Sequence, residues 1–534
     1  MASLWSFRPL ISPPTPRGTV EDRSLDRSEI QEHISRHEGS IRHLDIRIAG
    51  LLKDVRDLQL QKFTHQQAVS KYLGLITLAR KLPPELLALI FELCVQDGYT
   101  RTPLYVSHVC SEWREATKAP TLWRYIHVSA GDRNPYARTA FWLSRARNVP
   151  LRITLDVGLD VAHISSSVDM LLYRASDWET FSLDATTVSH ANQVLDMCAR
   201  VQGFQQLRTV SLSVAQETTV LDVPGLGAED FHPMRSALRE APLLNTLHVA
   251  RPFLPEPGVL PSHLTVFTLH LSSHPTTIYS ISALASVLTE LANLRDLSIA
   301  LTAGLKHAFI LRGNDHPLPV VLPDLQSLTL VGTESMFEIV EYIQAPVLRR
   351  LLIRSCVEPS GEPSAPLAFS LRRFIEGCAP PIDMLELHDI DLPPTSFAFC
   401  FANLRQLKHL RLHESDIEDD DVLRLMNCPS LSTLELRWCG QVSGKAIIDL
   451  VEHKMRRDGH VPVGELVMIN CSFVEDDDIV ALAERTVCRL VITDENDYCR
   501  PFGCCQNERY RRRLQLRRLA AHGMNQSHRK RLII

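Results

Sequence analysis

The sequence lacks any long apolar run and nowhere approaches the about eighteen consecutive apolar residues that a membrane-spanning helix needs. Its first ten residues, Met1–Leu10, have no long apolar core and are followed at once by proline-rich sequence, so we expect no signal peptide. The thirteen cysteines are odd in number and scattered, which predicts reduced thiols. These absences predict an intracellular protein, cytoplasmic or nuclear, with no membrane partner.

Signatures of catalysis are also missing. Gly440–Ala446 looks like a phosphate-binding loop, but only three residues separate its glycines, and Ala446 stands where a Mg²⁺-binding hydroxyl is needed. His37 and Glu38 begin like a zinc-protease helix, yet Ile41 replaces the second histidine. There is no G-x-S-x-G elbow and no G-x-G-x-x-G after a strand. We therefore predict that the chain is not an enzyme and uses no cofactor, and that the glycine loop is a repeat turn.

Two groups of residues could suggest a metal, and neither fits one. The acidic runs Glu414–Asp421 and Glu475–Asp478 lack the glycine and the spaced ligands of a calcium loop. Each precedes a predicted helix, where carboxylates complement the dipole, so we interpret both as helix starts. A zinc site near the end of the chain is disfavoured because its cysteines include an adjacent pair and form no C-x-x-C knuckle. Its candidate ligands are Cys499, Cys504, Cys505, His522 and His528.

What is present is a globular composition with an uneven charge. Hydrophobic residues make up 45% and charged residues 22%, and 534 residues predict two or three folded units. The net charge is −5, but the tail, 500–534, holds ten Lys and Arg against one acidic residue. Its basic clusters, 510–513 and 528–531, could direct nuclear import or contact nucleic acid. A solvated end is the favoured interpretation, so nucleic acid is not expected as the main partner.

The N-terminal part divides into a proline-containing flexible lead-in, 1–28, and a helical segment, 29–80. Isoleucine or valine at a positions and leucine at d positions favour a parallel two-stranded coiled coil, which would make residues 30–60 a homodimer contact. The alternative is an antiparallel hairpin whose second arm is Phe63–Leu78. The a residues are Ile34, Ile41, Ile48 and Val55, and the d residues are His37, Leu44, Leu51 and Leu58.

The next segment, 81–128, reads as a small helical unit. Pro83 and Pro84 suit the first turn of a helix, where a missing N–H costs little. One predicted helix has an apolar face at three- and four-residue spacing, and a second helix ends before Pro120. About 47 residues are too few to bury so many large apolar groups, so part of this surface should be covered. The two faces comprise Leu86, Leu89, Ile90 and Leu93, then Val106, Val109, Cys110 and Trp113.

This segment resembles the F-box. The matching residues are Leu82-Pro83-x-Glu85-Leu86-Leu87, Ile90-Phe91, Val106-Ser107-x-Val109-Cys110-x-x-Trp113-Arg114 and Leu122-Trp123. The resemblance implies a three-helix unit that docks onto the Skp adaptor of a cullin–RING ubiquitin ligase. A helical coil before an F-box and repeats after it also resembles a layout of fungal F-box proteins. The expected adaptor contacts are Leu82, Pro83, Leu86, Ile90, Val109, Trp113 and Trp123.

An L-x-x-L-x-L unit recurs through the rest of the chain, 150–499. Each unit predicts a short strand followed by chain enough for a helix, and no unit can cover its own apolar face. Stacking is therefore expected to give an α/β leucine-rich-repeat solenoid, curved, with parallel strands on the concave face and helices outside. Before Ile382 the spacing is irregular. The units start at Trp178, Leu207, Leu244, Leu264, Leu294, Leu325, Leu348, Ile382, Leu407, Leu431, Val463 and Val487.

The later repeats carry a cysteine at a fixed place. Asn427-Cys428-Pro429-x-Leu431-x-x-Leu434-x-Leu436-x-x-Cys439, followed by Val442-Ser443, resembles the cysteine-containing leucine-rich repeat of F-box proteins. Cys471 and Cys356 stand at the matching place of other repeats. Their spacing follows the repeat and not metal-ligand geometry, so we predict that these thiols pack in the interior.

The outward positions of the later strands are the expected binding surface for a target protein of unknown identity. Glu386, Arg411 and Glu435 should share one row on neighbouring strands, either as lateral ion pairs or as part of a charged platform. We predict a substrate-recognition subunit of an SCF-type (Skp–cullin–F-box) ubiquitin ligase. The alternatives are a non-catalytic scaffold outside ubiquitination and a nuclear nucleic-acid-associated protein. The expected target contacts are Glu386, His388, His409, Arg411, His413, Glu435 and Arg437.

Overall fold

The computed structural model separates the chain into two compact units, Met1–Leu87 and Ala88–Ile534. Among the described residues, none of the helices is both long enough and apolar enough to cross a membrane. The basic clusters of the tail, residues 1–25 of the lead-in and the candidate zinc ligands beyond residue 498 lie outside the described residues, and the helix α1 begins within the predicted lead-in, at Arg27. The structure describes 26–76, 82–158, 161–201, 203–214, 231–238, 241–251, 254–271, 279–301, 309–310, 319–356, 364–469, 471, 473–491 and 532–533.

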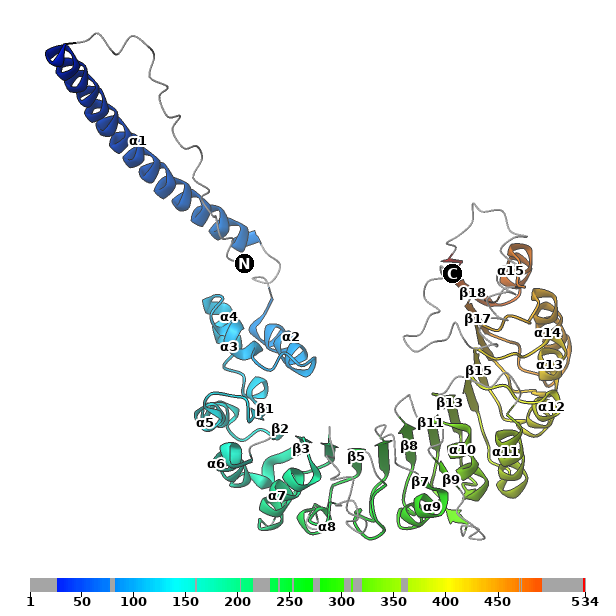
Figure 1. Cartoon of the computed structure of the whole chain (residues 1–534). Coiled ribbons are helices and arrows are strands. Elements are labelled where there is room, and N and C mark those ends of the chain that lie inside the picture. The colour runs from blue at the N-terminus through cyan, green and yellow to red at the C-terminus, as the bar shows by residue number, and fades with distance from the viewer. Residues whose placement is uncertain are drawn as a thin grey trace. The chain divides into compact units, whose positions relative to one another are not determined.

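Helix α1, Arg27–Ile76, is a single uninterrupted helix of 50 residues (Figure 1). A hairpin with a second arm at Phe63–Leu78 needs a turn before Phe63, and the helix runs straight through that point, so the hairpin alternative is wrong. The reason is local: no glycine or proline lies between Gly50 and Gly74, a stretch that includes the point where the turn would be needed. The predicted a and d residues Ile41, Leu44 and Ile48 are exposed.

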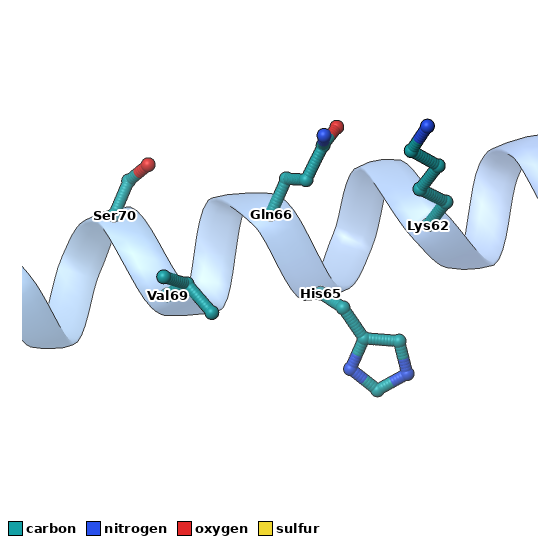
Figure 2. Close-up of a pocket in the computed structure, with 5 residues that line it drawn as sticks. All are labelled: Lys62, His65, Gln66, Val69 and Ser70. Atoms are coloured by element: carbon teal, nitrogen blue, oxygen red, sulfur yellow. The ribbon is translucent and has the colours of Figure 1, made fainter.

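The apolar seam of α1 ends after Leu58. Continuing the heptads puts Lys62 at the next a position and His65 at the next d position, so polar side chains replace the apolar ones there. Figure 2 shows these two with Gln66, Val69 and Ser70, all projecting outward around a shallow hollow on the helix surface. The hollow is bordered by one helix and gathers no set of convergent polar groups.

Helix α2, Pro84–Gln96, starts at the second of the paired prolines, as predicted. The second predicted helix is divided into α3, Thr102–Ser107, and α4, Ser111–Ala116, with Cys110 in an extended conformation between them. Arg114 Nε donates a hydrogen bond of 2.9 Å to the Ser107 carbonyl, which satisfies an acceptor that the interrupted helix leaves open. A short 3₁₀ turn, Pro120–Trp123, follows.

The core of the second unit is one long sheet. Its neighbouring strands are parallel from β1 to β18, and β19 pairs antiparallel with β18 at the end. In sheet order the strands are β1 (Tyr125–Ser129), β2 (Leu151–Asp156), β3 (Trp178–Ala185), β4 (Thr209–Val214), β5 (Thr246–Arg251), β6 (Val266–Leu271), β8 (Asp296–Leu301), β11 (Ser327–Gly332), β13 (Arg350–Ser355), β14 (Met384–His388), β15 (His409–His413), β16 (Thr433–Arg437), β17 (Glu465–Ile469), β18 (Val487–Val491) and β19 (Leu532–Ile533). Two small parallel pairs lie apart from this sheet, β7 (Tyr279–Ser280) with β9 (Phe309–Ile310) and β10 (Val320–Val321) with β12 (Ile343–Gln344).

The helices between the strands lie on the other side of the repeats from the sheet (Figure 1). Parallel strands stand about 4.8 Å apart whereas packed helices need 8–10 Å, so each repeat is wider on its helical side. The stack is therefore a curved leucine-rich-repeat solenoid with strands on the concave face, as predicted. The helices are α5 (Pro135–Ala146), α6 (Val161–Leu172), α7 (Val188–Ala199), α8 (Met234–Ala237), α9 (Ile281–Thr289), α10 (Glu334–Phe337), α11 (Ala365–Cys378), α12 (Pro394–Asn403), α13 (Asp419–Arg424), α14 (Gly444–Arg456) and α15 (Asp476–Ala483).

All twelve predicted repeat units form strands, and the last has a different register from the one expected. Leu490 pairs with Met468, the second inward position of β17, and Cys488 pairs with Leu466, the first. Val487, expected to be the leading apolar residue of the unit, is exposed. The register of β18 is therefore displaced by two residues, and Cys488 stands opposite Leu466, where Leu490 was expected.

The sheet also begins earlier than residue 150. Strand β1 lies inside the segment assigned to the F-box, and β2 precedes the first recognised unit. Both strands alternate, with Ile126, Val128 and Ile153 buried. Trp123 does stand at the repeat spacing, three residues before Ile126, but it was assigned to the Leu-Trp pair that closes the F-box motif, and Pro150 holds the matching place before Ile153.

The cysteines of the later repeats are buried, as predicted. Cys439 Sγ donates to the Leu412 carbonyl at 3.4 Å, and Cys471 Sγ donates to the Leu436 carbonyl at 3.5 Å, so each thiol reaches the strand of the preceding repeat. Burial raises the pKa of Cys471 to about 11. These thiols are packed, protonated groups with little nucleophilic character.

The acidic runs are helix starts, as predicted. Asp419, Asp420 and Asp421 form the first turn of α13, and Glu475 and Asp478 form a capping box at the start of α15. The glycine loop is a repeat turn that leads into α14 from the N-cap Ser443. Asp419 accepts hydrogen bonds of 2.7 Å from both the Ser443 main-chain N–H and its hydroxyl, which joins the two repeats.

Candidate functional site

Three neighbouring strands, β14, β15 and β16, present a charged surface on the concave face. Their central outward residues Glu386, Arg411 and Glu435 lie in one row, which confirms the predicted register. The strand ends, His388, His413 and Arg437, form a second row beside it. We call these six residues the charged platform.

The residue after each of these strands has a left-handed conformation. Asp389, Glu414 and Trp438 have φ values of 53°, 55° and 60°. Each donates its main-chain N–H to the last strand residue of the following repeat: His413, Arg437 and Ile469, at 2.9, 2.7 and 2.8 Å. The ladder is thereby extended by one bond at the point where the chain turns, which holds the end row of the charged platform in place.

Ion pairs link the charged platform sideways. Arg411 lies between two carboxylates, with Nη1 3.3 Å from Glu386 Oε2 and Nε 3.1 Å from Glu435 Oε2. Arg437 pairs with Glu435 Oε1 on its own strand. The Glu386 and Glu435 side chains are only 11% and 9% exposed, so these pairs are better shielded from solvent than ordinary surface pairs. The ion pairs that we predicted between neighbouring strands of this row are therefore present.

The two histidines complete the network. His388 Nε2 lies 2.5 Å from Glu386 Oε1, and the Nδ1 atoms of His388 and His413 are 2.9 Å apart. His413 Nε2 faces Glu435 Oε1 at 3.5 Å. Predicted target contact His409 lies in a third row, between Met384 and Thr433.

The network shifts the ionisation of its members. The contact with the His413 ring and the Arg437 guanidinium lower the pKa of Glu435 to about 2, against the opposing effect of burial. The His388 ring, helped by Arg411, lowers the pKa of Glu386. Burial lowers the pKa of His413, and the neighbouring His388 and Arg437 act in the same direction. Both carboxylates are therefore ionised at neutral pH.

A second surface lies on α2. Two sets of large apolar residues alternate along this helix: Leu87, Phe91 and Val95 are buried, and the other set is exposed. The exposed set follows the i, i+3, i+4, i+7 spacing of one helix face. We call it the α2 surface, and its members are Leu86 (47% exposed), Leu89 (54%), Ile90 (42%) and Leu93 (52%).

The α2 helix is tied to the first strands of the sheet by polar contacts. Gln96 Nε2 donates to the Tyr125 hydroxyl at 2.7 Å, and that hydroxyl donates to Glu92 Oε1 at 3.2 Å. Arg124 Nε lies 3.7 Å from the same Glu92 oxygen, and its Nη2 lies 3.6 Å from Glu179 on β3. The polar side of α2 thus faces the solenoid through half-buried groups and the exposed Gln96.

The predicted adaptor contacts divide by burial. Pro83, Leu86, Ile90 and Val109 are exposed, and Leu82 is half-buried. Trp113 is half-buried, with its ring centroid 5.0 Å from that of Phe91.

Trp123 is only 3% exposed and is an interior residue of this fold. Its Nε1 donates to the Thr117 carbonyl at 2.7 Å, and its ring packs edge-on against Trp142 with centroids 5.3 Å apart. We therefore leave Trp123 out of the exposed surface. Leu89, Leu93 and Tyr105 are exposed and were missing from the predicted contacts, although the helical spacing of the first two marks them.

Comparison with known proteins supports the assignment of the helical segment. Residues 79–129 match the family model described as F-box-like, a stretch that includes α2, α3, α4 and β1. No curated protein matches the chain.

Two solved structures are similar to the chain at low sequence identity. One is from the crystal structure of the Rad7 and Elc1 complex in yeast, at 14% identity and a TM-score of 0.35, covering 82% of this chain and 96% of that one. The other is an internalin, InlF, from Listeria monocytogenes, at 12% identity and a TM-score of 0.31, covering 78% of this chain and 95% of that one.

Proposed function

We propose that this chain is a substrate-recognition subunit of an SCF-type ubiquitin ligase, binding an Skp-family adaptor through the α2 surface. The observation that carries the proposal is a coincidence of two features. The F-box-like match covers α2, and α2 is the helix that leaves four large apolar side chains exposed along one face. Such a face is typical of a helix that is covered by a partner.

The size of the α2 surface is sufficient for an anchor. Burying a leucine or isoleucine side chain contributes roughly 1.5–3 kcal/mol, and these residues are about half exposed here. Four of them along one helix face supply an apolar centre, and a charge placed within it would be desolvated without a partner when the adaptor binds.

The target protein is proposed to bind the concave face at the charged platform. Concave surfaces of solenoids are large and accept partners across several repeats. The side chains there carry both signs of charge and are held by one another, which favours selection by electrostatic complementarity. In this role the chain makes and breaks no bonds itself. It raises the effective concentration of the target near a ubiquitin-transfer centre.

Helix α1 is proposed to pair in parallel with α1 of a second copy. Its exposed isoleucines and leucines stand at a and d positions over four heptads, the combination that favours two strands. A dimer would present two concave faces and two α2 surfaces in one particle, which increases avidity for a target with repeated features.

The test is capture of purified Skp-family adaptor by the full chain. Leu89→Asp and Leu86→Asp should each reduce capture by at least tenfold, because each places a charge in the dry centre of the contact. Val480→Asp is the matched control: Val480 is also an exposed apolar helix residue, on α15, and its substitution should leave capture unchanged.

Retained capture by folded Leu89→Asp and Leu86→Asp proteins would show that the adaptor does not bind α2. Adaptor capture without co-purification of a cullin would support the alternative of a scaffold outside ubiquitination. Comparing ubiquitinated partners of the wild type and of Leu89→Asp, with degradation blocked, separates these outcomes.

A further inference from the structure

Within the charged platform, Glu386, His388 and His413 place their ligand atoms close together. One oxygen or nitrogen from each lies within 4.8 Å of the others. Two of the residues come from β14 and the third from β15, and His388 is the direct neighbour of His413 in the parallel register. The backbone ladder therefore holds the three side chains on adjacent strands, independent of any flexible loop.

The hydrogen bonds of this cluster leave one nitrogen without a partner. An ionised carboxylate can only accept, so His388 Nε2 is the donor to Glu386 Oε1. In a neutral His388 ring, Nδ1 is then an acceptor, and His413 Nδ1 must be the donor in the 2.9 Å contact. In this tautomer His413 Nε2 keeps a lone pair, whereas the other tautomer, with its Nε2–H toward Glu435, is the one that lowers the pKa of that carboxyl. His413 Nε2 is buried and has no hydrogen-bond partner in the described part of the chain.

The surroundings of His413 Nε2 are also acceptors. Its nearest charged neighbour is Glu435 Oε1 at 3.5 Å, a distance too long for a good hydrogen bond. A lone pair facing a carboxylate oxygen is unfavourable, and the Arg437 guanidinium, which pairs with the same Glu435 oxygen, offsets part of this repulsion. A metal ion bound to a histidine nitrogen of the cluster would use a lone pair that no donor of the described residues satisfies.

Neighbouring residues orient the carboxylates. Arg411 binds Oε2 of both Glu386 and Glu435, and in each glutamate the remaining oxygen, Oε1, is directed toward a histidine ring. Hydrogen bonds that fix a carboxylate in this way are the usual outer support of a metal ligand. Arg411 thus positions Glu386 and would not itself bind the ion.

We propose that Glu386, His388 and His413 form a binding site for a transition-metal ion, with Zn²⁺ as the expected occupant. Two imidazoles and one carboxylate suit zinc, whereas calcium and magnesium require oxygen ligands. Zinc bonds of about 2.0–2.1 Å hold two ligand atoms at most about 4 Å apart, so small side-chain rotations close the site. Three protein ligands leave a fourth position open on the concave face.

The site is a property of the repeats and would bind metal whether or not α2 binds an adaptor. The experiment uses the full chain, stripped with a chelator and titrated with Zn²⁺ by calorimetry and with Co²⁺ by visible absorption. The wild type should bind one more metal ion per chain than the His413→Gln variant does. The same difference of one ion is expected between the wild type and the His388→Gln variant. His409→Gln is the matched control, because His409 lies on the same strand as His413 but in another row, and it should keep the ion.

Two further measurements separate this site from other ligands of the chain. A variant with Cys499→Ser, Cys504→Ser and Cys505→Ser should retain the ion, and the Co²⁺ spectrum should lack a thiolate charge-transfer band. Zn²⁺ should raise the melting temperature of the wild type and of His409→Gln more than that of His413→Gln. Equal stoichiometry in the wild type and in folded His413→Gln and His388→Gln would overturn the proposal and leave a proton-sharing network in its place.

Discussion

Lys454 Nζ donates a hydrogen bond of 2.6 Å to the main-chain carbonyl of Cys428, although Lys454, on α14, is only 1% exposed. A second acceptor, the Pro429 carbonyl, lies 3.4 Å away. The ammonium thus satisfies the carbonyls that end the preceding repeat, 26 residues earlier in the chain. Burial lowers the pKa of Lys454 to about 8.

This relationship predicts an alkaline dependence of stability. Between about pH 8 and pH 10.5, the unfolded lysine keeps a proton that the folded lysine has lost, so the free energy of unfolding should rise with pH across that window. Lys454→Met should remove this slope. The measurement is urea unfolding of both proteins from pH 7.5 to 10. Burial raises the pKa of thiols such as Cys400 and Cys471, so they make the free energy of unfolding fall with pH, equally in both proteins. Parallel slopes in the wild type and in Lys454→Met would contradict the assignment.

Glu435 predicts a dependence of stability on pH in the acid range. Its pKa is about 2 in the folded chain and ordinarily 4.5, so its stabilising contribution is complete above pH 4.5 and is lost as pH falls toward 2. Glu435→Gln should lower the free energy of unfolding at pH 7 by on the order of 2 kcal/mol. It should also reduce the dependence of that free energy on pH below about pH 4.5. Glu376→Gln is the control, since Glu376 pairs with Arg372 on an exposed face of α11 and should change little.

Gly444 is predicted to be intolerant of a side chain. A Cβ atom at this position would lie 2.0 Å from Asp478 Oδ2 and 2.5 Å from Asp478 Cβ. Asp478 in turn accepts the Glu475 N–H at 2.9 Å in the capping box of α15. Gly444→Ala should therefore cost about 1–3 kcal/mol, measured by chemical unfolding. Adding Asp478→Gly, which removes all of the clashing atoms, should cost less in the Gly444→Ala background than in the wild type, and additive losses would argue against the clash.

How far the sequence predicts this structure depends on whether each residue obeys the repeat. Leu431, Leu434 and Leu436 occupy every inward place, and the strand forms where expected. Trp123 keeps the repeat spacing before Ile126, but it also completes the F-box motif, and β1 was missed because the residue was assigned to that motif alone. Cys488 is a small residue at a leucine place, and the register of β18 was assigned two residues late.

The sequence predicts that the charged residues lie in one row, but it does not predict which of their side chains contact one another. Period-two alternation places Glu386 beside Arg411 and His388 beside His413, because parallel strands align equivalent positions. Which atoms meet depends on side-chain rotamers, and those follow from the packing of the whole platform. The orphaned nitrogen of His413 becomes visible only once the hydrogen bonds of its neighbours are counted.

Helix α1 offers a prediction with an internal control. Ile41→Asn with Ile48→Asn places two polar groups in the apolar seam, so a dimer should become a monomer. Ile46→Asn replaces an equally exposed isoleucine at an f position, outside the seam, and should leave the dimer intact. Light scattering at micromolar concentration gives the masses. A monomeric wild-type protein would show that α1 does not pair with itself.

The platform itself is tested by reversing the charge at its centre. Arg411→Glu puts three carboxylates in one row with Glu386 and Glu435, so it should abolish capture of a target that recognises this charge pattern. Arg411→Glu should also destabilise the later repeats. Arg411→Met removes the positive charge without adding a third carboxylate, so a loss of target capture by a folded Arg411→Met protein reports lost recognition and not lost folding. Trp438→Ala, at the left-handed residue beside Arg437, tests the edge of the same surface.

The matched control for charge reversal is Arg372→Glu. Arg372 is also an exposed arginine paired with a glutamate, but it lies on α11, on the helical side of the repeats. Partners captured from cells by the wild type and by Arg372→Glu should be the same, and those that depend on the platform should disappear with Arg411→Glu, Arg411→Met and Trp438→Ala. If all of these folded variants capture the full set, the target binds elsewhere on the concave face, on the strands before Ile382.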